Sequence, residues 1–262
     1  MLASDALLER PESGDHLVQL YEADEQALVR NVARYLLEGL TLGSSLIVVA
    51  TLEHETAFRR ELEAAGADPQ AAVSAGQLKF LNAEVTLAQF LIDGHPDADL
   101  FEQTVGVAVR QAAERAGDRG VRAFGEMVGV LWASKQYPAA IRLEQLWHKL
   151  MKSVEFNLFC GYPIDIFAKQ FDIGIVDALL CAHTHLLPSG SNAKLESALT
   201  RATNDVLGAR LAGLKPLMKR NFRPAWAALP NGEAMVLWLR NNLPDRADEI
   251  LGLAREYYNA AG

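Results

Sequence analysis

The chain has little cysteine, no excess of positive charge and no long apolar run, and each absence excludes a class of protein. Its 262 residues contain two cysteines, Cys160 and Cys181, too few for a disulfide framework and without the paired spacing of a zinc knuckle. Lys and Arg number 25 against 33 Asp and Glu, giving a net charge of −8, so the overall field repels nucleic acid and anionic lipid. No stretch reaches the roughly 18 uncharged apolar residues that a membrane span needs, and the first residues lack a signal-peptide pattern. We therefore expect a cytoplasmic protein with neither a nucleic-acid nor a membrane partner.

The composition that remains is that of an ordinary globular protein. Half of the residues are hydrophobic and 22% are charged, which excludes a disordered tail or linker. A chain of this length suits one large α/β domain with a small appendage.

Short apolar segments alternate with segments of helical periodicity over the first two thirds of the chain. The expected strands are His16–Tyr21, Ser45–Ala50, Gln77–Leu81, the start of Val121–Leu131, and Phe156–Tyr162. Helical spacing predicts helices over Glu22–Leu40, Glu53–Ala65, Leu87–Asp93, Asp97–Ala116, Ala139–Ser153 and Ile175–Leu187. This alternation predicts an α/β fold, with a mainly parallel sheet and helices on both faces.

The chain changes character after residue 188. Pro188-Ser-Gly-Ser-Asn indicates a hinge, and the later helices are expected over Lys194–Leu211, Gly232–Asn242 and Arg246–Ala260. The first of these carries an apolar stripe of Leu195, Leu199, Ala202 and Val206, which must pack against the main domain or against a second copy in a homodimer. We divide the chain into a polar leader (1–14), an α/β domain (15–188) and a helical C-terminal extension (189–262).

A phosphate-binding loop is missing where a nucleotide-binding α/β domain would carry it. The first strand–helix junction reads Tyr21-Glu-Ala-Asp-Glu-Gln, which offers acidic side chains instead of glycine amides, a lysine and a hydroxyl. We therefore expect no ATP hydrolysis and no nucleotide cofactor.

Two expected strands end in residues that could form a binding site. Glu126 follows the strand that ends in Phe124-Gly125, and Cys160-Gly161-Tyr162-Pro163 occupies the equivalent end of the next strand. Ligands of open α/β sheets bind at these carboxyl ends. The alternatives are a structural role for Glu126, capping a loop or pairing with Arg122, and a role for Cys160 as a small buried hydrophobe.

The histidines near residue 184 carry weaker signals. Helical spacing places His183 on the buried face of its helix and His185 on another face, so the two make a poor chelating pair. A core histidine that only makes a hydrogen bond is one interpretation of His183; a metal site of His16, Cys160 and a tail histidine is another. Histidine five residues before Pro188 also resembles the phosphoacceptor box of sensor kinases, but the following acidic and basic residues are missing.

Several short motifs in order together resemble the MEDS family, the sensory domain of methanogens and methylotrophs, over about residues 15–188. They are His16-Leu-Val-Gln-Leu-Tyr21, Glu38-Gly39-Leu40, Phe124-Gly-Glu-Met127 with Leu131-Trp132, Cys160-Gly-Tyr-Pro163 and His183-Thr-His-Leu-Leu-Pro188. The resemblance implies a RecA-like core without a working phosphate loop, and recognition of small hydrocarbon-type ligands upstream of a signalling output. The chain carries neither a helix-turn-helix before this segment nor a kinase module after it, so the output route is left open.

We expect a sensor rather than an enzyme, because no nucleophile, base and orienting group can be assembled from spacing. The predicted ligand-binding residues are Tyr21, Glu126, Trp132, Cys160, Tyr162 and His183. The expected partners are a small-molecule ligand and a signalling protein. The alternative function is a ligand-free scaffold that docks a kinase or regulator through its helical tail.

Overall fold

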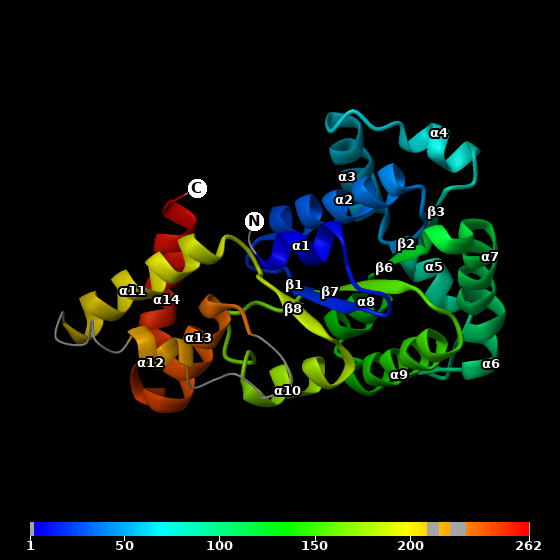
Figure 1. Ribbon diagram of the computed structural model, residues 1–262. Helices are drawn as coiled ribbons and strands as arrows, with labels where there is room; N and C mark the ends of the chain where they lie inside the picture. Colours follow the sequence, from blue (N-terminus) through cyan, green and yellow to red (C-terminus); the bar gives the residue numbers. More distant parts are fainter. Residues whose placement is uncertain (1–2, 209–214, 221–228, 262) are drawn as a thin grey trace. The chain divides into compact units, whose positions relative to one another are not determined.

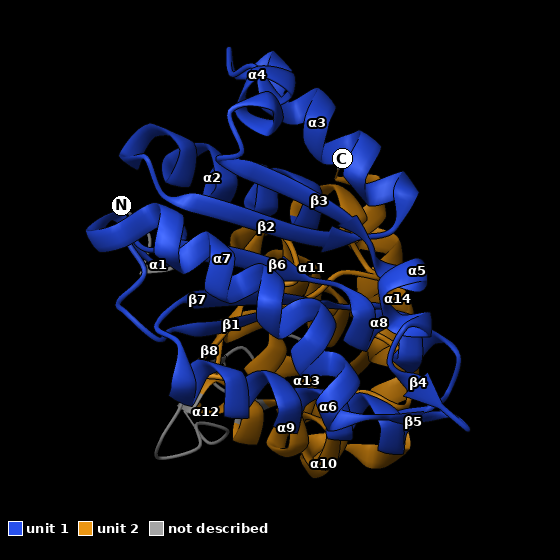
Figure 2. Ribbon diagram, turned by 90° about the vertical axis from the view of Figure 1, so that its right-hand side faces the viewer, with its two compact units in different colours: residues 1–18, 28–163 blue, residues 19–27, 164–262 orange. Residues whose placement is uncertain are grey.

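The computed structural model describes residues 3–208, 215–220 and 229–261 (Figure 1). The chain divides into two compact units, coloured separately in Figure 2. Unit 1 contains residues up to Val18 and Leu28–Pro163, and unit 2 contains Gln19–Ala27 and Ile164 onward. Each unit is described by itself below.

A parallel sheet forms the centre of unit 1. Its strands are β1 (His16–Leu20, whose last two residues belong to unit 2), β2 (Ser45–Ala50), β3 (Leu78–Asn82), β6 (Val121–Gly125) and β7 (Asn157–Tyr162). The strand order of the full sheet is β3-β2-β6-β7-β1-β8, where β8 is His185–Leu187. β2 pairs in parallel with β3 and β6, and β6 pairs in parallel with β7. Because Val49 is opposite Gly125 and Gly125 is opposite Cys160, the carboxyl ends of three neighbouring strands meet at one edge.

Helices cover both faces of this sheet. On one face Tyr35 of α2 packs against Phe159, and Phe58 of α3 packs against Phe124; α9 lies on the other face, with Trp147 close to Gly125. The helical segments of unit 1 are α1 (Ala3–Glu9), most of α2 (Glu25–Leu42), α3 (Leu52–Ala64), α4 (Pro69–Ser74), α5 (Ala83–Ala88), α6 (Ala98–Phe101), the π-helical η1 (Glu102–Gly106), α7 (Val107–Ala116), the 3-10 turn η2 (Gly117–Arg119), α8 (Met127–Ala133) and α9 (Tyr137–Ser153). The predicted α/β class, a mainly parallel sheet with helices on both faces, is thus confirmed.

Unit 2 consists mainly of helices. They are α10 (Ile173–Ala182), α11 (Asn192–Leu207), α12 (Lys215–Arg220), α13 (Asn231–Asn242) and α14 (Pro244–Ala260), with the short strand β8 (His185–Leu187). The predicted stripe of α11 is buried at Leu195, Leu199 and Ala202, and α13 and α14 pack against this helix. The C-terminal helices were therefore predicted correctly, and most of the stripe of α11 is covered within the chain, whereas Val206, its fourth expected member, is half-buried. Positions 209–211 of the expected helix lie outside the described residues.

Two local predictions were wrong. The expected helix Ile175–Leu187 ends at Ala182, because His183 takes an extended backbone (φ −121°, ψ 148°) and His185–Leu187 becomes β8. The expected helix Leu87–Asp93 begins and ends earlier, as α5, because the Asn82 side chain caps its first turn. Leu91–Ile92 (β4) instead pairs antiparallel with His95–Pro96 (β5). The turn between them is Asp93-Gly94, both with positive φ, a known hairpin signal.

The N-terminal segment contains a helix, and the described helices were also compared with the requirements of a membrane span. Ala3–Glu9, within the segment expected to be a polar leader, forms α1 and buries Leu8. In the described residues no helix combines the length and the apolar character needed to span a membrane.

Candidate functional site: two buried polar clusters in unit 1

The first cluster surrounds Glu126 at the carboxyl ends of β2 and β6. The Glu126 side chain is 2% exposed. Its Oε2 accepts hydrogen bonds from the Thr51 backbone N–H at 2.9 Å and the Thr51 hydroxyl at 3.3 Å. Its Oε1 lies 2.5 Å from Nδ1 of His54. We refer to Thr51, His54 and Glu126 as the Glu126 cluster.

Parallel pairing explains why these residues meet. Thr51 follows β2 directly and Glu126 follows β6, and the Glu126 backbone N–H donates to the Val49 carbonyl at 2.9 Å. Thr51 is also the N-cap of α3, and its hydroxyl accepts from the His54 backbone N–H, which fixes His54 in the first helical turn. The imidazole then stacks on Phe58, with ring centroids 5.6 Å apart.

The sequence predicted Glu126 but not its partners. One sequence signal could have indicated these partners. Thr51 stands between a buried strand and a helix, which is an N-cap position, and His54 follows three residues later. The alternative partner, Arg122, donates instead to the backbone carbonyls of Leu8, Tyr35 and Glu9.

The second cluster lies between the sheet and α9. His16 Nε2 lies 3.3 Å from the Cys160 sulfur and 3.6 Å from Glu144 Oε2. The Tyr162 hydroxyl donates to the other carboxylate oxygen, Glu144 Oε1, at 2.6 Å. All four side chains are buried. We refer to His16, Glu144, Cys160 and Tyr162 as the Cys160 cluster.

Strand alternation and helix periodicity bring this cluster together. Cys160 and Tyr162 are two apart on β7, so their side chains point to the same face of the sheet. Glu144 precedes Trp147 by three positions on α9 and follows Ala140 by four, so it lies on the buried stripe of that helix. An acidic residue on an apolar stripe was the signal that sequence reasoning missed.

Burial keeps the thiol and the phenol of this cluster protonated. Burial, and then the nearby Glu144 charge, raises the pKa of the Cys160 thiol well above its ordinary value. Burial and the same carboxylate raise the pKa of Tyr162. A neutral buried thiol is a poor nucleophile. The cluster alone therefore does not offer an activated cysteine.

Cys160 nevertheless belongs to a group with metal-binding chemistry. The ligand atoms of His16, Glu144 and Cys160 lie within 4.8 Å of one another. The structure thus brings together His16 and Cys160, two members of the metal site considered from the sequence, and adds Glu144. The third expected member, a tail histidine, belongs to unit 2.

Trp132 connects the Cys160 cluster to an aromatic group. Its ring makes an edge contact with Tyr162, with centroids 5.4 Å apart, and lies 4.7 Å from the Tyr137 ring. The Trp132 side chain is half-buried. Of the predicted binding residues, Trp132, Cys160 and Tyr162 therefore lie close together, and Glu126 lies at the end of the neighbouring strand.

The remaining predicted residues, Tyr21 and His183, belong to unit 2. His183 is buried, and its Nδ1 lies 2.6 Å from the Leu179 carbonyl, as the interpretation of a hydrogen-bonded core histidine requires. Tyr21 precedes the N-terminus of α2, where the Asp24 carboxylate accepts from the Ala27 backbone N–H at 3.0 Å. A carboxylate thus occupies the position where a phosphate would bind at a helix N-terminus.

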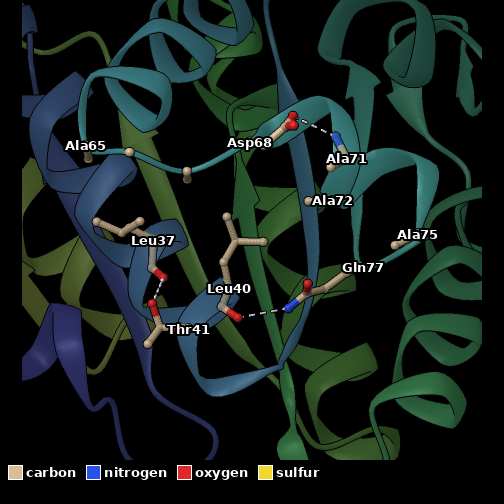
Figure 3. A pocket seen from close by; sticks show the side chains of 11 residues that line it. Leu37, Leu40, Thr41, Ala65, Asp68, Ala71, Ala72, Ala75 and Gln77 are labelled. Atoms are coloured by element: carbon tan, nitrogen blue, oxygen red, sulfur yellow. Dashed lines mark hydrogen bonds between the residues drawn. The ribbon is translucent and has the colours of Figure 1, made fainter.

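An open pocket of about 590 Å³ lies at the opposite, amino edge of the unit 1 sheet (Figure 3). It is lined mainly by alanine and leucine side chains from α2, α4 and the loop before α4. Its polar groups bond within the protein: Thr41 to the Leu37 carbonyl, Asp68 to the Ala71 N–H, and Gln77 to the Leu40 carbonyl. Because it is open and lined mainly by small apolar side chains, this pocket is a weaker candidate than the two clusters.

Comparison with known families agrees with the motifs. The family model MEDS, the methanogen/methylotroph, DcmR sensory domain, matches residues 15–184. The chain belongs to the MEDS family. Both clusters of unit 1 fall inside the matched segment, and α11 to α14 fall outside it. MEDS is a family of sensory domains, which supports a general sensory role for this protein. No curated protein matches the chain.

Proposed function

We propose that this MEDS protein binds a small hydrocarbon-type molecule at the carboxyl edge of the unit 1 sheet and passes the binding event to the helices after residue 188. The observation that carries the proposal is the Glu126 cluster, a buried carboxylate at the strand ends where open α/β sheets bind ligands. Membership in a sensory family supports the same role. The recipient of the signal in this proposal is a signalling protein.

The chemistry of the cluster suits a ligand with one polar group. His54 and Thr51 hold the Glu126 carboxylate in place, so it can act as a fixed polar anchor. The rings of Trp132 and Tyr162 supply apolar surface nearby. Cys160, Tyr21 and His183 remain binding residues predicted from sequence. A ligand moves the helical region only if it binds two arrangements of the chain with different affinity.

Hydrogen exchange of the full chain tests the proposal, with dichloromethane as the apolar probe and methanol as the polar one. A probe that binds should raise the unfolding midpoint and change amide protection in Asn192–Leu207 (α11). Glu126→Gln should abolish both effects. Glu53→Gln, an exposed acid beside His54, is the matched control and should respond like the wild type. Unchanged α11 protection while the midpoint rises would exclude the coupling but not the binding.

A second function, the ligand-free scaffold that docks a regulator, is favoured by one observation. The Glu126 carboxylate already has donors inside the protein, from Thr51 and His54, so a ligand is not needed to satisfy it. Absence of any midpoint shift with either probe, together with retention of a partner by the isolated chain, would support the scaffold instead.

A further inference from the structure

The Cys160 cluster has a feature that packing alone does not require. It places a thiol, an imidazole and a carboxylate, from β7, β1 and α9, with their ligand atoms converging in the interior of unit 1. Ionisable groups are seldom buried together in an apolar interior, because desolvation penalises their charged forms. A bound cation compensates that penalty by neutralising the thiolate and the carboxylate.

The separations fit the edges of a tetrahedral site. A zinc ion has bonds of about 2.0–2.1 Å to nitrogen and oxygen and about 2.3 Å to sulfur, which places tetrahedral ligand atoms roughly 3.3–3.5 Å apart. His16 Nε2 lies 3.3 Å from the Cys160 sulfur and 3.6 Å from Glu144 Oε2. These two separations therefore match tetrahedral edges to within a few tenths of an ångström, and the Cys160 sulfur lies within 4.8 Å of the Glu144 carboxylate.

The donor types restrict the choice of metal. Thiolate and imidazole ligands favour zinc and similar borderline transition metals, whereas Mg²⁺ and Ca²⁺ prefer oxygen ligands. We propose that His16, Glu144 and Cys160 form a zinc-type metal site in unit 1. The three side chains fill three positions of a tetrahedron, and one further donor completes it.

Tyr162 acts as a positioning residue for this site. Its hydroxyl donates to Glu144 Oε1 at 2.6 Å, which turns the other oxygen, Oε2, toward His16. Ligating carboxylates are commonly oriented by such hydrogen bonds, and removing one typically weakens metal affinity about 10–100-fold. On binding, the Cys160 thiol releases its proton to solvent and the sulfur forms its bond to the metal.

This inference goes beyond the proposed sensing of an organic ligand and is tested without one. The full chain, freed of metal with a chelator and kept anaerobic, is titrated with Co²⁺ alone. The expected result is one equivalent per chain, with the sulfur-to-cobalt charge-transfer band that reports a thiolate ligand. Zn²⁺ should then displace Co²⁺ and remove the band.

Variants assign the ligands. Cys160→Ser should abolish the charge-transfer band, whereas Cys181→Ser, at the exposed cysteine, should keep it. His16→Ala and Glu144→Gln should each weaken Co²⁺ binding about a hundredfold or more. These two variants test the ligand assignment if Cys160→Ser does not fold. His148→Ala, at an exposed histidine of the same α9, is the matched control. Tyr162→Phe should weaken affinity about 10–100-fold while the band keeps its shape.

Two results would overturn the assignment. One is a wild-type chain that takes up no stoichiometric Co²⁺, and the other is a thiolate band that survives Cys160→Ser and is lost in Cys181→Ser. Neither result depends on Glu126 or on the response to dichloromethane and methanol, so failure here is distinguishable from failure of the proposed function.

Discussion

His54 and Glu126 form a buried pair in which the imidazole Nδ1 lies 2.5 Å from the carboxylate Oε1. The two residues are 72 positions apart and come from α3 and from the end of β6. Both side chains are nearly inaccessible to water, so this contact replaces hydration that each polar group loses on burial. The pair therefore couples the first helix after β2 to the edge of the sheet.

Removing His54 should destabilise unit 1 strongly. His54→Ala removes the imidazole from the buried Glu126 carboxylate, and breaking a buried pair in this way costs about 3–5 kcal/mol. Urea unfolding measures the loss, with His148→Ala at an exposed position as control, expected within about 0.5 kcal/mol of wild type. A double-mutant cycle with Glu126→Ala should give a coupling energy of about 1–3 kcal/mol. A coupling energy near zero would mean that the two side chains do not interact in solution.

A close approach of α8 to β7 makes Gly129 irreplaceable. A Cβ at position 129 would lie 2.7 Å from the Gly161 carbonyl oxygen, so Gly129→Ala must displace the helix that carries Trp132. We expect a loss of about 1–3 kcal/mol in unfolding free energy.

The matched control for Gly129 is Gly252→Ala in the middle of α14, where a Cβ would meet nothing within 4 Å. There alanine should stabilise the protein by about 0.5–1 kcal/mol, because glycine weakens helix interiors. If Gly129→Ala behaved like Gly252→Ala, the close approach of α8 to β7 would be disproved.

Much of the fold could be predicted because periodicity and composition agree there. Ser45–Ala50 is a continuous apolar run and was predicted to the residue. The apolar stripe of α9 was also predicted, and it is buried at Leu143, Leu146, Trp147 and Leu150. The failures came where a short apolar run suits either element. The sequence of Ile175–Leu187 is compatible with a single helix. In the structure the helix ends before His183, because the backbone of His183 is extended, and a short strand follows.

The candidate site could be predicted only at strand ends. Glu126 and Cys160 follow from topology, because parallel strands carry their carboxyl ends to one edge. His16 was considered beside Cys160 from the sequence, as a possible metal ligand. The other partners, His54 and Glu144, come from helices, and which rotamer reaches which group depends on packing that no local pattern encodes. Helical spacing did place Glu144 on a buried stripe, so that residue could have been found.

The stripe of α11 should stabilise the chain independently of protein concentration. Leu199 is fully buried within unit 2, where α13 and α14 pack against α11, so Leu199→Ala should cost about 2–5 kcal/mol. The unfolding midpoint should not depend on chain concentration, either for the wild type or for Leu199→Ala. The predicted homodimer then has no support from this stripe. A midpoint that rises with concentration in the wild type but not in Leu199→Ala would place the stripe in an interface.

Alkaline pH should destabilise the metal-free protein through groups that are buried in their protonated form. Burial raises the pKa of Cys160 above its ordinary value of 9.0 and the pKa values of Tyr35 and Tyr162 above 10.0. Above pH 9 the unfolded chain begins to lose protons that the folded chain retains. The unfolding free energy therefore has its full value below about pH 9 and falls as pH rises through the folded pKa values, by about 1.4 kcal/mol per pH unit for each such proton.

Cys160→Ser isolates the contribution of the thiol to this fall. Serine has no group that titrates in this range, so between pH 9 and pH 10 the variant should lose stability less steeply than the wild type. The difference in slope should approach about 1.4 kcal/mol per pH unit. Cys181→Ser removes an exposed thiol and is the matched control, with a slope expected close to that of the wild type. Urea unfolding with a chelator present measures the unfolding free energy at each pH for the wild type, Cys160→Ser and Cys181→Ser. Equal slopes for the wild type and Cys160→Ser would show that the Cys160 thiol is not held protonated by burial.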